Sequence, residues 1–175
     1  MLNFLNRKYL LVDTCFVSAL YRSRETKEDR FEPFLQQIKA EHCTLTINDF
    51  IYLEFIRIAK SQKEKEKIEN FLKKHFDIIP ITNEIIESKS VYPLYNFCNK
   101  GKDQISVTDV LNVAFLKKYG KNLFLITFDN NDYPLKILDR PITGTIDVET
   151  QILTYGIYYF NQTKFNHILK IFNRK

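Results

Sequence analysis

The chain has 175 residues, a length that suits one domain, or one domain with a modest extension, and leaves little room for two. Hydrophobic residues make up 45% of it, with only four glycines and five prolines, which excludes collagen-like, low-complexity and broadly disordered proteins. The 26 lysines and arginines exceed the 21 acidic residues, and this net charge of +5 favours polyanionic partners such as nucleic acids.

The cysteines and the apolar segments indicate a reduced, cytoplasmic protein. Cys15, Cys43 and Cys98 are odd in number and form no Cys-x-x-Cys pair for zinc, haem or redox chemistry. Asp13 interrupts the apolar stretch near the N-terminus, which disfavours an export signal. No apolar run approaches the roughly 18 residues that a membrane span needs, so we expect no membrane partner.

Strand and helix alternate along the first half of the chain. The apolar run at residues 8–12 is typical of a buried parallel strand, and a second short strand is expected at 44–47. Helices are predicted at residues 15–22, 31–39, 50–60 and 62–76, the last of them a surface helix with alternating lysines and glutamates.

The second half continues the alternation. Strands are predicted at 78–81 and 122–128, and helices at 84–97, 107–119 and 163–172. This order predicts an α/β sandwich around a mainly parallel sheet. We expect the main domain to span residues 1–150, and residues 151–175 to form an aromatic and basic helical extension packed on it.

Two aspartates follow predicted strands directly. Asp13 ends the first strand, and Asp129 follows the strand that carries Leu125 and Ile126. Ligands of open parallel sheets bind at the carboxyl ends of the strands, so both carboxylates are expected at one edge of the sheet. The alternative for Asp13 is a structural role as a turn or helix-cap residue.

Two more acids are expected on helices. Glu54 interrupts an apolar helix face, where a carboxylate needs a cation or hydrogen bonds; the alternative is a rim position paired with Arg57. Asp109 stands in the first turn of its helix, where aspartate is also common for structural reasons. Polar neighbours that could orient these acids, or add to them, are Asn112, Thr127 and Asp132.

Convergence of Asp13, Glu54, Asp109 and Asp129 would cost much electrostatic energy without a cation. Mg²⁺ or Mn²⁺ removes this cost, because hard divalent cations take oxygen ligands and combine carboxylates with substrate phosphate oxygens. An acidic pocket that holds such a metal, in a chain of net positive charge, suits phosphodiester chemistry.

Over about residues 8–150 the chain resembles the PIN-domain ribonucleases, the family that includes the VapC-type toxins of bacterial toxin–antitoxin modules. Four segments carry the resemblance in the family's order and spacing: Leu10 to Thr14, Asn48 to Glu54, Ser106 to Asp109 in a helix that reaches Ala114 and Gly120, and Leu125 to Tyr133.

The resemblance implies an α/β/α sandwich with a central parallel sheet and Mg²⁺- or Mn²⁺-dependent cleavage of RNA. It implies that the acidic ligands are Asp13, Glu54, Asp109 and Asp129, with Asp132 as a fifth, and that Thr127 positions the water and the carboxylates. Cys15 departs from the family, in which many members have Asn or Ser, so one supporting polar contact is expected to be missing. The partners it suggests are RNA and an antitoxin protein. A second copy of the chain is a further expected partner, from the aromatic residues near the C-terminus.

The expected mechanism activates a water with the metal and needs no protein nucleophile. Lys100 and Lys102 are candidates for guiding the phosphate backbone, and Tyr92, Tyr95 and Phe97 for stacking bases. We interpret His42, His75 and His167 as ordinary surface or packing residues.

Three alternatives stay open. The first is a PIN-like fold that has kept only a nucleic-acid- or protein-binding role. The second is a DNA-directed or structure-specific nuclease. The third concerns the aromatic residues after Ile146, which could cover the sheet, form a dimer surface or contact a partner: Tyr155, Tyr158, Tyr159 and Phe160.

Overall fold

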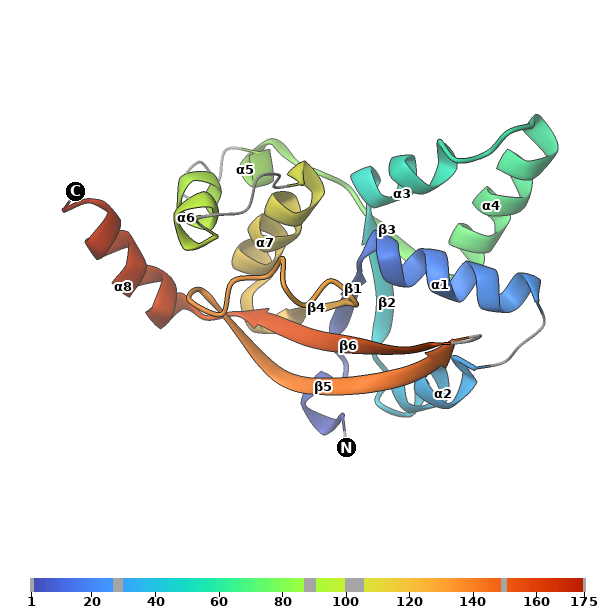
Figure 1. Ribbon diagram of the computed structural model, residues 1–175, viewed down its shortest axis with the longest axis horizontal. Helices are drawn as coiled ribbons and strands as arrows, with labels where there is room; N and C mark the ends of the chain where they lie inside the picture. The colour runs from blue at the N-terminus through green and yellow to red at the C-terminus, as the bar shows by residue number, and fades with distance from the viewer. Residues whose placement is uncertain (1, 27–29, 87–90, 100–105, 149–150, 175) are drawn as a thin grey trace.

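The computed structural model describes residues 2–26, 30–86, 91–99, 106–148 and 151–174. A six-stranded sheet with the strand order β3-β2-β1-β4-β6-β5 forms its centre (Figure 1). Its parallel strands are β1 (Tyr9–Val12), β2 (Thr44–Asn48), β3 (Asp77–Ile79) and β4 (Leu123–Thr127). The predicted α/β class with a mostly parallel central sheet is confirmed.

The central strands are apolar because both faces of the sheet are covered. Leu10, Leu11 and Val12 of β1 are fully buried, and every residue of β4 is buried. Strands β1 and β4 pair from Tyr9 with Leu123 to Val12 with Ile126, so their carboxyl ends lie side by side. The residues that follow these two strands therefore meet at one edge of the sheet.

Helices lie on both sides of the sheet, an arrangement compatible with a three-layer sandwich (Figure 1). In Figure 1, α1 to α4 lie to the right of the parallel strands and α5 to α8 to the left. The first group is α1 (Thr14–Glu25), α2 (Glu32–Ala40), α3 (Asp49–Ile56) and α4 (Gln62–His75). The second is α5 (Asn83–Ile86), α6 (Val91–Cys98), α7 (Val107–Tyr119) and α8 (Gln162–Phe172).

This division follows from the strand order. The chain moves outward from β1 to β2 to β3 and then returns to β4, and right-handed crossovers place helices on opposite faces when the direction reverses. Short 3₁₀ helices precede β1 (Asn3–Leu5) and β4 (Gly120–Asn122). The single helix predicted at 84–97 is present as α5 and α6, with residues 87–90 outside the described part of the chain.

The C-terminal part of the sheet corrects the expected extension. Residues 151–160 are not helical: β6 (Gln151–Phe160) pairs with β4 and with β5 (Leu138–Val148), both antiparallel. The strands on either side of the boundary expected at residue 150 are thus paired with each other in the central sheet. Only α8 matches the predicted helix at 163–172.

The aromatic residues of β6 mainly cover the sheet. Tyr155, Tyr158 and Phe160 are buried, and Tyr155 packs edge-on against Phe34 with ring centroids 5.4 Å apart. Phe160 packs against Phe165 of α8 at 5.1 Å. Of the three roles left open for these residues, covering the sheet is the one that these contacts support.

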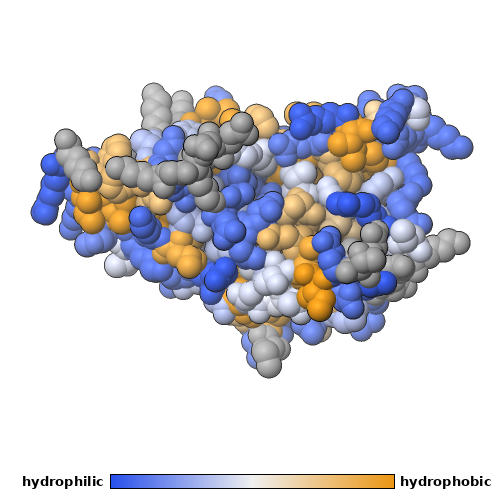
Figure 2. Space-filling view, viewed as in Figure 1, coloured by the Kyte–Doolittle hydropathy of each residue, from blue (hydrophilic) through white to orange (hydrophobic). Residues whose placement is uncertain are grey.

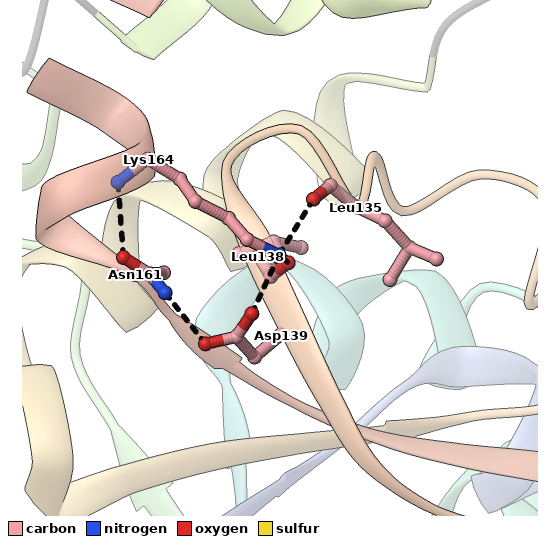
Figure 3. Close-up of polar contacts among 5 residues, drawn as sticks. All are labelled: Leu135, Leu138, Asp139, Asn161 and Lys164. Carbon is pink, nitrogen blue, oxygen red and sulfur yellow. Dashed lines mark hydrogen bonds and ion pairs between the residues drawn. The ribbon is translucent and has the colours of Figure 1, made fainter. Parts of the chain in front are cut away.

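A small polar cluster fixes the start of α8 to the β5 strand (Figure 3). Asn161 caps the helix by accepting from the backbone N–H of Lys164 at 3.0 Å, and its amide donates to Asp139 at 2.6 Å. The Lys164 ammonium lies 2.6 Å from Asp139 and also donates to the carbonyls of Leu135 and Leu138 at 3.0 and 3.2 Å. These bonds join α8 to the segment between β4 and β5.

Apolar side chains on the molecular surface are scattered. The face in Figure 2 shows separate apolar patches among hydrophilic side chains. Exposed large hydrophobic residues occur on several elements, among them Leu53 of α3, Val107 of α7 and Ile152 of β6. Within the described ranges, none of the helices has the length and apolar character that crossing a bilayer requires.

Candidate metal centre

Asp13 lies at the centre of a polar cluster at the carboxyl edge of the sheet. It follows β1 and caps α1, its Oδ1 accepting from the backbone N–H of Thr14 at 2.8 Å. Its Oδ2 accepts from the hydroxyls of Thr127, at 2.7 Å, and Tyr133, at 3.3 Å. Asp13 is only 5% exposed. Burial raises its pKa, and the charge of Asp129 raises it further, against the hydrogen bonds that act to lower it.

Asp109 approaches the same phenol from α7. Its Oδ1 lies 3.1 Å from the Tyr133 hydroxyl, which therefore stands between Asp13 and Asp109. Burial, followed by the charge of Asp13, raises the pKa of Asp109 to about 7. Burial also holds the pKa of Tyr133 well above its usual value, so the phenol keeps its proton and acts as a donor. Asp13 and Asp109 thus compete for the single hydrogen bond that the Tyr133 phenol can donate.

Glu54 joins the cluster through two threonine hydroxyls. Thr14 donates to its Oε2 at 2.7 Å, and Thr108 donates to its Oε1 at 2.8 Å. Thr14 directly follows Asp13 and Thr108 directly precedes Asp109 in the chain. The two oxygens of Glu54 are therefore bound to the immediate neighbours of Asp13 and Asp109. Helix α3 can place it there because Asn48, at the end of β2, caps the helix at Ile51.

Asp129 and Asp132 belong to the turn after β4. The backbone N–H of Asp129 donates to the Thr127 hydroxyl at 2.9 Å, and that of Asp132 donates to the carbonyl of Asp129 at 3.1 Å. Asp129 is exposed, and one of its oxygens lies within 4.8 Å of ligand atoms of Asp13 and Cys15. The charge of Asp132 contributes to the raised pKa of Asp109, so Asp132 interacts electrostatically with the acids of the cluster.

Cys15 corrects the expectation of a missing polar contact. Its sulfur lies 3.3 Å from the Thr127 hydroxyl and 3.7 Å from Asp13, and it accepts from the backbone N–H of Phe128 at 3.4 Å. The thiol thus makes contacts at the position where an amide or hydroxyl was expected. Burial, with the charge of Asp13, raises its pKa to about 12, so it stays a neutral thiol.

The structure joins the predicted acids Asp13, Glu54, Asp109 and Asp129 in one hydrogen-bonded network, with Thr127, Asn112 and Asp132 beside them. Among the residues that the structure describes, Asp13, Cys15 and Asp129 have ligand atoms within 4.8 Å of one another. Sequence reasoning assigned no role in the site to Asn48, Thr14, Thr108 and Tyr133, although all four lie within the segments that carry the resemblance. Thr14 and Thr108 are each adjacent to an acid in sequence, which is a local signal. Tyr133 carried no local signal, because its partners are distant in the chain.

The residues predicted to bind the substrate are either outside the described part of the chain or engaged in other contacts, Tyr92 excepted. Lys100 and Lys102 lie outside the described residues. Tyr95 is buried and donates to the carbonyl of Asp132, so it is unsuited to stacking a base. Phe97 already packs edge-on against the ring of Phe172. Tyr92 is half-buried. His42 and His167 are exposed, and His75 packs against Phe71 at the end of α4.

The donor set fits a hard divalent cation. Its oxygens are carboxylates, and the raised pKa values of Asp13 and Asp109 show that the fold holds these groups as anions only at a cost. A bound cation would remove that cost by offsetting the negative charge of both acids. No protein-family model, curated protein or solved structure matches the chain at a significant level.

Proposed function

We propose that the protein is a Mg²⁺- or Mn²⁺-dependent nuclease of the PIN-domain type that hydrolyses phosphodiester bonds in RNA. The observation that carries the proposal is the meeting of buried Asp13 and half-buried Asp109 at one phenol hydroxyl, with Glu54 and Asp129 beside them. This constellation calls for a cation, and the chain's net charge of +5 suits a polyanionic substrate. The resemblance of the four acidic segments supports the same reaction.

The protein side chains have distinct roles in this proposal. Asp13 and Asp109, with Asp129, would hold the metal, and Thr127 fixes the orientation of Asp13. Thr14 and Thr108 hold the Glu54 carboxylate toward the cluster. When bound, a divalent cation lowers the pKa of a water and offsets negative charge on the scissile phosphate. No side-chain nucleophile is required.

The first experiment measures Mn²⁺ binding by electron paramagnetic resonance. We expect Asp13→Asn and Asp109→Asn to lose affinity, because each removes an anionic ligand. Asp77→Asn is the matched control, since Asp77 is an exposed aspartate at the start of β3, at the opposite edge of the sheet. Equal affinity of wild type and all three variants would contradict the metal site.

The second experiment tests the chemistry and the choice of substrate. RNA and DNA oligonucleotides are incubated with Mn²⁺, and the product ends are identified by mass spectrometry. Attack by water is expected to tolerate a 2′-O-methyl group at the cleaved nucleotide and to give no 2′,3′-cyclic phosphate. Cyclic products would overturn the mechanism, and cleavage of DNA alone would favour a DNA-directed nuclease.

The binding-module alternative makes a different prediction. Metal binding without cleavage of any nucleic acid in the panel would support it. The toxin form of the proposal has its own test: a small neighbouring gene whose product binds this chain and suppresses its nuclease activity.

A further inference from the structure

A buried chain of hydrogen bonds runs from the backbone of α3 to the acids. It begins at the backbone N–H of Ile51, which donates to Asn48 Oδ1 at 3.0 Å. A backbone N–H can only donate, so it fixes which end of the Asn48 amide faces it. The Nδ2 of Asn48 consequently points away and donates to Asn112 Oδ1 at 2.9 Å.

The hydrogen bonds of Asn112 orient the Tyr133 phenol in the same way. With its oxygen occupied by Asn48, Asn112 presents Nδ2 to the Tyr133 hydroxyl and donates to it at 3.0 Å. The phenol oxygen is therefore an acceptor on the Asn112 side, and its one proton points to the carboxylates. Asn48 and Asn112 are 0% exposed and Tyr133 is 2% exposed, so solvent has little access to reorient the chain.

The phenol proton meets two acceptors at similar distances, 3.1 Å to Asp109 Oδ1 and 3.3 Å to Asp13 Oδ2. Both carboxylates thus lie within hydrogen-bonding reach of one fixed atom. The ring itself packs against Tyr158 at 5.5 Å between centroids, which holds the hydroxyl in place.

We propose that Tyr133 is a positioning residue for the metal ligands. Its hydroxyl, oriented by Asn48 and Asn112, sets the spacing of Asp13 and Asp109 so that the two carboxylates can bind one cation together. Because Asn48 also caps α3, the same chain links the helix that carries Glu54 to the other acids. The inference rests on the metal site of the proposed function and adds a specific residue to it.

Tyr133→Phe tests this role, because it removes the hydroxyl and keeps the ring. We expect its Mn²⁺ affinity, measured by electron paramagnetic resonance, to fall about 10- to 100-fold, the usual effect of losing a group that orients metal ligands. Tyr155→Phe is the control: it removes the hydroxyl of another buried tyrosine, which packs against Phe16 and Phe34 rather than the acids. Near-ultraviolet circular dichroism and thermal unfolding establish that each variant is folded at the temperature used.

Tyrosine absorbance gives a second readout, independent of affinity. The chain has ten tyrosines and no tryptophan, so metal-induced difference spectra report on tyrosines. We expect Mg²⁺ to change the spectra of wild type and Tyr155→Phe, and to leave that of Tyr133→Phe unchanged. A signal of undiminished size in Tyr133→Phe would show that the metal perturbs other tyrosines and not the Tyr133 phenol beside the acids, and that result would overturn the inference.

Asn112→Asp keeps the inference testable should Tyr133→Phe fail to fold. The new carboxylate can still accept from Asn48 but would also accept from Tyr133, which draws the phenol proton away from the metal ligands. Net charge alone predicts tighter cation binding by this variant, whereas the positioning role predicts weaker binding. Tighter binding would therefore contradict the inference.

These outcomes separate the inference from the proposed function. Mn²⁺ binding that depends on Tyr133, in a protein that cleaves no nucleic acid, would support the positioning role and overturn the nuclease. If Tyr133→Phe kept both the nuclease activity and the Mn²⁺ affinity of wild type, the nuclease would be supported and the positioning role overturned. A wild-type protein that binds no Mn²⁺ would overturn both.

Discussion

The hydroxyl of Thr127 donates to Asp13 Oδ2 at 2.7 Å and accepts from the backbone N–H of Asp129 at 2.9 Å. One side chain at the end of β4 therefore joins the acid that follows β1 to the acid that follows β4. Thr127 is fully buried, so solvent cannot replace either bond at the hydroxyl. Its position makes the geometry of Asp13 and Asp129 interdependent.

Thr127→Val should consequently weaken both stability and metal binding. Valine has nearly the shape of threonine but leaves Asp13 without its shortest hydrogen bond, so we expect the free energy of unfolding to fall by about 1–3 kcal/mol. Denaturant unfolding measures this change, and Mn²⁺ titration should show a parallel loss of affinity. Thr143→Val, at an exposed position of the edge strand β5, should change neither. Equal behaviour of the two variants would show that the Thr127 hydroxyl does not hold Asp13.

Gly156 controls the turn that carries Asp129 and Asp132. A Cβ at this position would overlap Asn130 Oδ1 and the ring of Tyr158. Asn130 anchors the turn by donating to the Thr154 carbonyl and accepting from the Tyr158 hydroxyl, both at 2.8 Å. We expect Gly156→Ala to cost about 1–3 kcal/mol of unfolding free energy, as overpacking does, and to lower Mn²⁺ affinity by displacing the turn.

Gly120→Ala provides the comparison for Gly156. Gly120 has a φ of +55° and open space around its Cβ position, so alanine there is strained without touching the acids. This variant should lose stability and keep its Mn²⁺ affinity. Loss of metal binding in both variants would mean that destabilisation alone accounts for the effect.

Strands β1 and β4 could be predicted because a strand covered on both faces is a continuous apolar run. The antiparallel hairpin could not, because β5 contains Pro141 and Gly144. Pro141 lies at the register shift between Asp139 and Ile142 on the edge strand, where a missing N–H is tolerated, and Gly144 makes room for the ring of Tyr155 across the pair.

The candidate site also contains residues that the sequence predicts and residues that it does not. Asp13 and Asp129 could be predicted because their positions follow directly from strand ends. The Asn48–Asn112–Tyr133 chain could not, since its bonds join residues 64 and 21 positions apart and depend on how α7 packs on the sheet. Local sequence predicts which edge of the sheet carries the acids, whereas tertiary packing decides what orients them.

Lys164 should matter for the attachment of α8 and not for the metal site. Its ammonium binds Asp139 and two backbone carbonyls, that of Leu135 before β5 and that of Leu138 at its start (Figure 3). We expect Lys164→Met to lower the unfolding free energy by about 1 kcal/mol, because the ion pair is partly exposed, and to increase hydrogen exchange in α8. Lys170→Met, at an exposed position of the same helix, serves as control. Loss of Mn²⁺ affinity in Lys164→Met would contradict this separation.

The stability of the metal-free protein should depend on Asp109 between pH 4 and pH 7. Its pKa is about 7 in the folded protein, raised by burial and by Asp13, against an ordinary value of 3.8. Over this range the native state holds a proton that the unfolded chain releases, so stability falls as the pH rises, with a slope of up to about 1.4 kcal/mol per pH unit. The penalty is absent below pH 4 and complete above pH 7. The raised pKa of Asp13 acts in the same direction.

Asp109→Asn isolates this contribution. The lowered pKa of His75, caused by burial and by Arg24 and Lys74, gives the opposite slope near its ordinary value of 6.5, but it is common to both proteins and cancels in their difference. Denaturant unfolding with a chelator present should show the variant gaining on wild type as the pH rises from about 4 to about 7, with no further gain above that range. Saturating Mg²⁺ should reverse the order at high pH, because the cation stabilises the wild-type native state and not the variant. A stability difference that is independent of pH would mean that burial and the charge of Asp13 do not raise the pKa of Asp109 in the metal-free fold.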